Sequence, residues 1–147
     1  MVKNKAIGIV FFDGDCNFCN ASIDFVFKRN RKKNLRYSSL QSEFAKSVLP
    51  KNIYISNDFK TMYYIENKNI YSKSSAFLKI VRHLKLPYNL LLCFWIIPKP
   101  IRDLTYTFIS RRRHKLVKKN TCRLTTKNEL YFFINTADHK EKYAYIY

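Results

Sequence analysis

Two cysteines three residues apart, Cys16 and Cys19, are the residues of this chain whose type and spacing most clearly point to chemistry. They follow the apolar run 6–12, which is rich in β-branched and aromatic residues and predicts a buried strand. The turn signal Asp-Gly-Asp at 13–15 ends that run, and an apolar stripe at helical spacing begins with Cys19. The pair is therefore expected on the first turn of a helix that follows a strand.

A cysteine in that position has a specific chemical advantage. Unpaired backbone N–H groups and the positive end of the helix macrodipole stabilise a thiolate. We expect Cys16 to be the exposed, attacking thiol. Cys19 lies one helical turn further on the same face, where a shielded thiol can resolve a mixed disulfide formed at Cys16. The pattern predicts thiol-disulfide exchange.

The two acidic residues of the turn add a second element to this hypothesis. Asp13, at the strand end, is the candidate for proton transfer to or from Cys19, directly or through water. Asp15 is expected to cap the helix. The alternative is that both carboxylates only accept hydrogen bonds from the N–H groups of the turn.

The cysteine pair has two other interpretations, which are half of a zinc site and two core cysteines at this spacing by coincidence. A structural zinc site takes four ligands, but Cys93, Cys122 and the three histidines are isolated from one another, so we expect neither metal nor cofactor. Cys93 lies within the apolar run 90–97 and is expected to pack in a buried helix. Cys122 is either a third redox thiol or a residue that docks the last helix on the core.

The remaining pattern predicts one α/β domain over residues 1–147. A βαβ unit is followed by a β-hairpin and then by additional helices toward the C-terminus. The expected strands are 6–12, 35–38, 52–56, 61–66 and 70–71. The first expected helix starts at Cys16, and the others cover 42–49, 74–84, 87–97, 100–115 and 126–134.

The charge balance supports a competing function. The 147 residues include 28 Lys and Arg against 10 Asp and Glu, a formal net charge of +18. Basic clusters at 28–33 and 111–119 would attract nucleic acid, anionic lipid or an acidic protein. Arg111, Arg112 and Arg113 are the expected contact to such an anionic surface. In this alternative the chain is a nucleic-acid or membrane-surface binding module, and the cysteine pair is structural.

Other classes are excluded or disfavoured by composition. Only two glycines occur, so neither a P-loop nor a dinucleotide-binding G-x-G-x-x-G motif is present. No secretory signal is visible at the N-terminus, and the longest apolar run is far shorter than a bilayer-spanning segment. We therefore expect a cytoplasmic protein without a transmembrane segment.

The motif around the pair resembles the DCC family of thiol-disulfide oxidoreductases, whose opening is an apolar strand followed by Asp-Gly-X-Cys-X-X-Cys. Asp13, Gly14, Cys16 and Cys19 match that opening. Further matches are Leu40-Gln-Ser42, Ser74-Ser-Ala76, Pro98-Lys-Pro100 with Arg102 and Asp103, and Cys122-Arg-Leu124. The likeness covers roughly residues 6–135 and leaves the tail 136–147 unassigned.

The resemblance implies a thioredoxin-like core and exchange of electrons with a protein or a small thiol. Thioredoxins also carry a cis-proline opposite the cysteine pair, just before a strand. Pro50 is the candidate for that role, although a short helix is expected before it.

Overall fold

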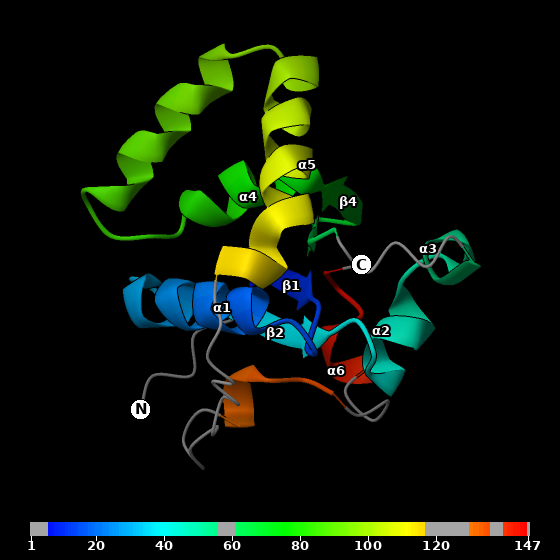
Figure 1. Cartoon of the computed structure of the whole chain (residues 1–147). Helices are drawn as coiled ribbons and strands as arrows, with labels where there is room; N and C mark the ends of the chain where they lie inside the picture. The colour runs from blue at the N-terminus through cyan, green and yellow to red at the C-terminus, as the bar shows by residue number, and fades with distance from the viewer. Residues whose placement is uncertain (1–5, 56–60, 117–129, 136–139, 147) are drawn as a thin grey trace.

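The computed structural model describes residues 6–55, 61–116, 130–135 and 140–146 (Figure 1). Four strands form one sheet in the order β2-β1-β3-β4. Their bounds are β1 Gly8–Phe12, β2 Leu35–Ser39, β3 Tyr63–Glu66 and β4 Asn69–Ser72. β1 pairs in parallel with β2 and antiparallel with β3, and β3 pairs antiparallel with β4. This is the strand order of a thioredoxin-like core, and it confirms the predicted fold class.

Helices cover both faces of this sheet. They are α1 Asn17–Arg29, α2 Glu43–Val48, α3 Lys51–Ile55, α4 Lys73–Val81, α5 Lys99–Leu116 and α6 Lys140–Tyr143, with two 3₁₀ helices, η1 Tyr88–Ile96 and η2 Leu130–Phe132. α1 makes the crossover between the parallel strands β1 and β2, which completes the predicted βαβ unit.

The central strand β1 contributes side chains to two separate hydrophobic clusters, because successive side chains of a strand point to opposite faces of the sheet. Ile9 and Phe11 belong to a cluster that includes residues of α2, α3 and α6. Val10 and Phe12 belong to a second cluster, which includes both cysteines of the pair and residues of α1 and α4. Figure 1 shows α2, α3 and α6 grouped away from α4 and α5. The cysteine pair therefore lies on the α1/α4 side of the sheet.

The predicted strand at 52–56 is wrong, because residues 51–55 form the helix α3. Ile53 donates its N–H to the carbonyl of Pro50 and is buried by helix packing, so its apolar character did not require a strand. Pro50 therefore joins two helices and does not precede a strand. Among the described residues the cis peptide bond is Leu86–Pro87.

The reversal predicted between the strands 61–66 and 70–71 is confirmed, because β3 and β4 form an antiparallel hairpin. β3 and β4 are joined by Asn67 and Lys68, which both adopt positive φ angles (50° and 63°). That conformation suits a two-residue hairpin turn.

The expectation of a buried helix at 90–97 is also wrong. η1 has no buried residue, and Cys93 on it is exposed. Consecutive apolar residues on a short helix project in all directions, and only one side of η1 can face α4. The rest of this apolar segment remains in contact with solvent.

Other expectations fall outside the described residues. They are Cys122, the capping-box segment 126–129 and positions 136–139 of the tail.

His83 follows α4 and joins two buried polar groups. Its Nε2 lies 3.2 Å from the Tyr64 hydroxyl, and its Nδ1 lies 3.3 Å from Asn34 Nδ2. Burial lowers the pKa of His83 below its ordinary value of 6.5.

This shift predicts a pH-dependent stability. At a pH between the lowered pKa of His83 in the folded protein and its ordinary pKa of 6.5, the unfolded chain binds more protons than the folded protein. The free energy of unfolding should therefore fall as the pH drops below 6.5. Urea unfolding of the native protein and of His83→Gln at about pH 7.5 and about pH 5.5 tests this. The native protein should lose more stability than the variant, and equal losses would contradict the assignment.

Candidate active site

Cys16 is the N-cap residue of α1. Its backbone is extended, with φ −96° and ψ 113°, and its carbonyl accepts the first helical hydrogen bond from Asn20 N at 2.9 Å. Its Sγ accepts a hydrogen bond from the N–H of Cys19 at 3.4 Å. The first turn of α1 contains no acidic residue. This confirms the predicted place of Cys16 at a helix N-terminus, where backbone N–H groups favour a negatively charged sulfur.

The predicted difference in exposure between the two thiols is wrong. Cys16 is 1% exposed and Cys19 is 7% exposed, so both are buried, and Cys16 is the more enclosed. The N-cap hydrogen bond folds Cys16 Sγ back over the first turn of α1, and Cys16 packs in the same cluster as Val10 and Phe12. Both cysteines are free thiols.

The turn before the pair is held by Gln41, which sequence reasoning noted only as part of a matching motif. Gln41 Nε2 donates to Asp13 Oδ1 at 2.9 Å and to Asp15 Oδ2 at 3.3 Å. Gln41 Oε1 accepts the N–H of Gly14 at 3.0 Å. The Gln41 amide therefore contacts three consecutive residues of the turn, although Gln41 lies 27 positions after Gly14 in the sequence.

Asp13 and Asp15 differ in their roles. Asp13 Oδ1 also accepts the N–H of Asp15 at 3.1 Å, so the interpretation that Asp13 satisfies turn N–H groups holds. The expectation that Asp15 caps α1 is wrong, because Cys16 occupies the N-cap position. Asp13 is half-buried and lines the same cavity as Cys19, which keeps it a candidate for proton transfer.

Gly14 is required by close packing. A Cβ atom there would lie 2.6 Å from Ser39 Oγ, which itself contacts Gln41 Oε1. Asn20 Nδ2 donates to the Gly14 carbonyl at 2.8 Å. The turn is therefore fixed from β2 on one side and from α1 on the other.

Replacing Gln41 by leucine should lower the free energy of unfolding by about 1–3 kcal/mol, because the N–H of Gly14 and two carboxylates lose their partner. Urea denaturation measures the effect. Asn52→Leu is the matched control, since it also removes an amide but from an exposed position on α3. Its effect should stay within about 0.5 kcal/mol. Similar losses in the two variants would contradict the role assigned to Gln41.

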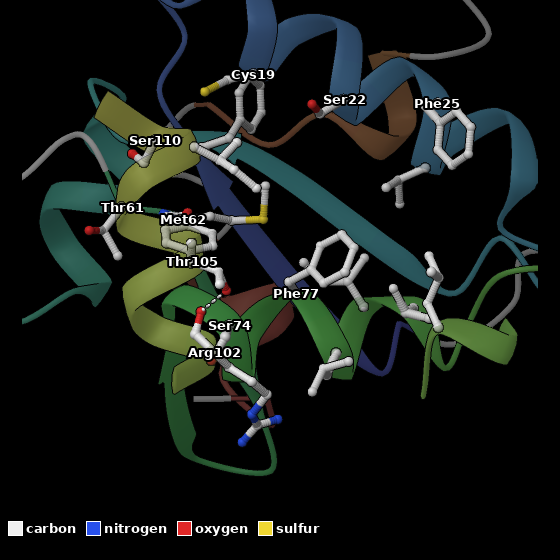
Figure 2. Close-up of a pocket in the computed structure, with 18 of the residues that line it drawn as sticks. Cys19, Ser22, Phe25, Thr61, Met62, Ser74, Phe77, Arg102, Thr105 and Ser110 are labelled. Atoms are coloured by element: carbon white, nitrogen blue, oxygen red, sulfur yellow. Dashed lines mark hydrogen bonds between the residues drawn. The ribbon is translucent and has the colours of Figure 1, made fainter. Parts of the chain in front are cut away.

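A cavity of roughly 780 Å³ lies beside the pair, between α1, α4, η1 and α5. Its wall is mainly apolar and includes Phe25, Met62 and Phe77 (Figure 2). Cys19 and Asp13 line it, whereas Cys16 does not. The structure thus opens a path to Cys19 that the sequence pattern did not indicate, because four separate segments form the wall.

One hydrogen-bonded pair attaches α5 to α4 next to this cavity. Ser74 Oγ donates to Asp103 Oδ1, and the N–H of Ser74 donates to the same oxygen at 3.3 Å. Ser74 therefore does not cap α4 as expected; the N-cap residue is Ser72. The contact brings Ser74 and Asp103 together, although they are 29 positions apart in the sequence.

In the described part of the chain no three His, Cys, Asp or Glu side chains lie together in a way that could hold a metal ion. Cys93 lies on η1, away from the position of the pair on α1.

Comparison with known proteins agrees with this geometry. Residues 10–119 match the family of DCC1-like thiol-disulfide oxidoreductases. The chain belongs to this family. The matched DCC1-like region begins within β1 and includes both cysteines, the strands β2, β3 and β4, and α5.

Two relatives resemble this DCC1-like chain over most of its length. One is the uncharacterized protein YuxK of Bacillus subtilis (strain 168), 40% identical over 117 residues, which cover 79% of this chain and 85% of the relative. The other is a chloroplastic DCC family protein of Arabidopsis thaliana, 33% identical over 118 residues, which cover 79% of this chain and 69% of the relative. No solved structure matches the chain.

Proposed function

We propose that this protein exchanges electrons with a disulfide or dithiol substrate through Cys16 and Cys19. The observation that carries the proposal is the hydrogen bond from the Cys19 N–H to Cys16 Sγ at the N-terminus of α1. Membership of a thiol-disulfide oxidoreductase family supports the reaction type.

In the reducing direction the proposed reaction has two steps. The Cys16 thiolate attacks one sulfur of a substrate disulfide, forms a mixed disulfide and releases the other substrate sulfur as a thiolate. Cys19 then loses its proton and attacks Cys16 Sγ, which forms the Cys16–Cys19 disulfide and releases the second substrate thiolate. Two electrons pass from the pair to the substrate. Two molecules of an external small thiol, or one protein dithiol, reduce the pair again by the reverse of both steps and are themselves oxidised to a disulfide.

Asp13 is the proposed acceptor of the Cys19 proton. Both residues line the apolar cavity, and Asp13 is the one carboxylate among the described residues that line it. Gln41 holds the Asp13 carboxylate through Oδ1 at 2.9 Å and so acts as a positioning residue.

Access to the pair constrains the substrate. Both thiols are buried, so a segment that covers Cys16 must move before a substrate can reach it, whereas Cys19 lines the cavity. The electrostatic argument favours attack by Cys16, because its sulfur receives the helix N–H.

The test of this proposal is a trapping experiment with Cys19→Ser. Without the resolving thiol, mixed disulfides through Cys16 should accumulate and be visible on non-reducing gels, with Cys16 identified by mass spectrometry. The double variant Cys16→Ser with Cys19→Ser is the control and should trap nothing. Adducts through Cys19 in Cys16→Ser, with none through Cys16 in Cys19→Ser, would reverse the two roles. No adduct in either single variant would support a binding module with a structural cysteine pair.

A further inference from the structure

The hairpin formed by η1 and α5, residues 85–116, exposes an unusual number of large apolar side chains. Nine of them are about half exposed or more, and they include Leu90, Phe94, Trp95, Ile96, Leu104 and Phe108. Ile96 is 87% exposed. Figure 1 shows η1 lying away from the sheet, whereas α5 passes α4 and reaches α1, and it packs against both helices. Exposed apolar clusters of this kind mark interaction surfaces in soluble proteins.

The same hairpin is strongly basic. Residues 85–116 contain seven Lys and Arg and one acidic residue, Asp103, whose carboxylate is bound to Ser74. Lys85, Lys99, Arg111 and Arg112 are exposed. In the described part of the chain the one ion pair is Lys79–Glu66, so these four cations are not paired with a described carboxylate.

Cations and aromatic rings alternate along the hairpin. The guanidinium of Arg102 lies 5.4 Å from the centre of the Trp95 ring, and that of Arg112 lies 4.3 Å from the centre of the Phe108 ring. Side chains of this kind place an apolar stem or ring in a nonpolar layer while the charged end stays at its polar boundary.

We propose that the η1–α5 hairpin docks this protein on the surface of an anionic lipid bilayer. Its apolar side chains would enter the region between headgroups and acyl chains, and its Lys and Arg side chains would contact lipid phosphates. No described helix is long and apolar enough to cross a bilayer. In the proposed binding mode the hairpin lies on the bilayer surface. The inference goes beyond the redox reaction and does not rest on it.

Charge complementarity and the exposed apolar side chains favour an anionic membrane over a second copy of this chain and over nucleic acid. A second copy of this hairpin would bring two clusters of cations together, which opposes self-association. Nucleic acid would attract the cations but would leave Ile96, Leu104 and other apolar side chains in water. An anionic bilayer satisfies both the charge and the apolar surface.

Docking would also orient the cavity. Phe94, Ile101 and Ile109 are exposed and also line the cavity that reaches Cys19. One wall of the cavity is thus part of the docking surface.

The full chain carries its own reporter, because Trp95 is its only tryptophan. We would titrate the protein with vesicles of phosphatidylcholine alone or mixed with phosphatidylglycerol, at about 50 mM salt. The mixed vesicles should shift Trp95 emission to the blue, and acyl-chain-brominated lipid should quench it. About 0.5 M salt should release the protein, because counterions screen the attraction.

Matched variants separate the two contributions. Ile96→Ser should weaken binding to the mixed vesicles about tenfold, whereas Ile70→Ser, a similar change at an exposed position of β4, should not. Arg111→Glu with Arg112→Glu should weaken it at least about tenfold, whereas Lys46→Glu with Lys51→Glu on α2 and α3 should have a smaller effect. Far-UV circular dichroism confirms that each variant is folded.

Three results would overturn the proposal. The first is Trp95 emission unchanged by the mixed vesicles. The second is equal binding to neutral vesicles, or equal losses in the variants and their matched controls. The third is a blue shift that grows with protein concentration without vesicles, or that single-stranded DNA produces equally well, which would assign the hairpin to self-association or to nucleic acid.

Discussion

Replacing Cys16 by serine is expected to reduce catalysed thiol-disulfide exchange to the rate measured without protein. A serine hydroxyl is not ionised at neutral pH and forms no disulfide, so neither the attacking step nor the resolving step remains. The fold should persist, because serine also places an oxygen that can accept the Cys19 N–H at the N-cap of α1. Reduction of a small aromatic disulfide by a dithiol, followed by absorbance, measures the rate.

Cys93→Ser is the matched control for this experiment. Cys93 is an exposed free cysteine on η1, outside the turn and helix that hold the pair. Its replacement should leave the exchange rate unchanged. Retention of activity in Cys16→Ser, or loss of activity in Cys93→Ser, would contradict the assignment of the reactive pair.

Replacing Phe44 by alanine should cause the largest loss of stability among the substitutions considered, about 3–5 kcal/mol. Phe44 on α2 is fully buried and stacks on Phe11 of β1, with ring centres 6.1 Å apart and planes inclined by 8°. Its removal leaves a cavity between α2 and the central strand.

Phe94→Ala provides the comparison for Phe44→Ala, because Phe94 is half exposed on η1. Its replacement should cost less than about 1 kcal/mol. Both variants are to be measured by urea unfolding at one pH. If the two losses were equal, α2 would not pack on the sheet as the structure describes.

Local signals in the sequence were sufficient for the part of the fold around the cysteine pair. The apolar run before Asp13, the turn at 13–15 and the helical stripe that begins at Cys19 predicted a strand, a turn and a helix in their observed places. These signals work because strand and helix periodicities are both expressed within a dozen residues.

Features set by long-range packing were not predictable in the same way. The segment 52–56 is too short for its period to separate a strand from a helix, and its burial against the sheet gave α3. The burial of Cys16 depends on the cluster with Val10 and Phe12, and the role of Gln41 depends on a contact between distant positions. None of these contacts leaves a periodic pattern.

The cavity beside Cys19 illustrates the same limit. Its wall combines α1, α4, η1 and α5, and α1 is separated from α4 by three strands and two helices in the sequence. The apolar run at 90–97 was interpreted as buried because apolar length indicates burial on average. The segment is exposed because only one side of η1 can face α4 in the hairpin of η1 and α5.

A redox titration of the full chain against reduced and oxidised glutathione tests the central claim most directly. Samples equilibrated at each ratio are acid-quenched, alkylated and mapped by mass spectrometry. The account predicts a reversible two-electron transition in which a Cys16–Cys19 disulfide forms and disappears together, retained in Cys93→Ser and absent in Cys16→Ser. Absence of a Cys16–Cys19 disulfide at every ratio, with both thiols remaining reduced, would contradict it.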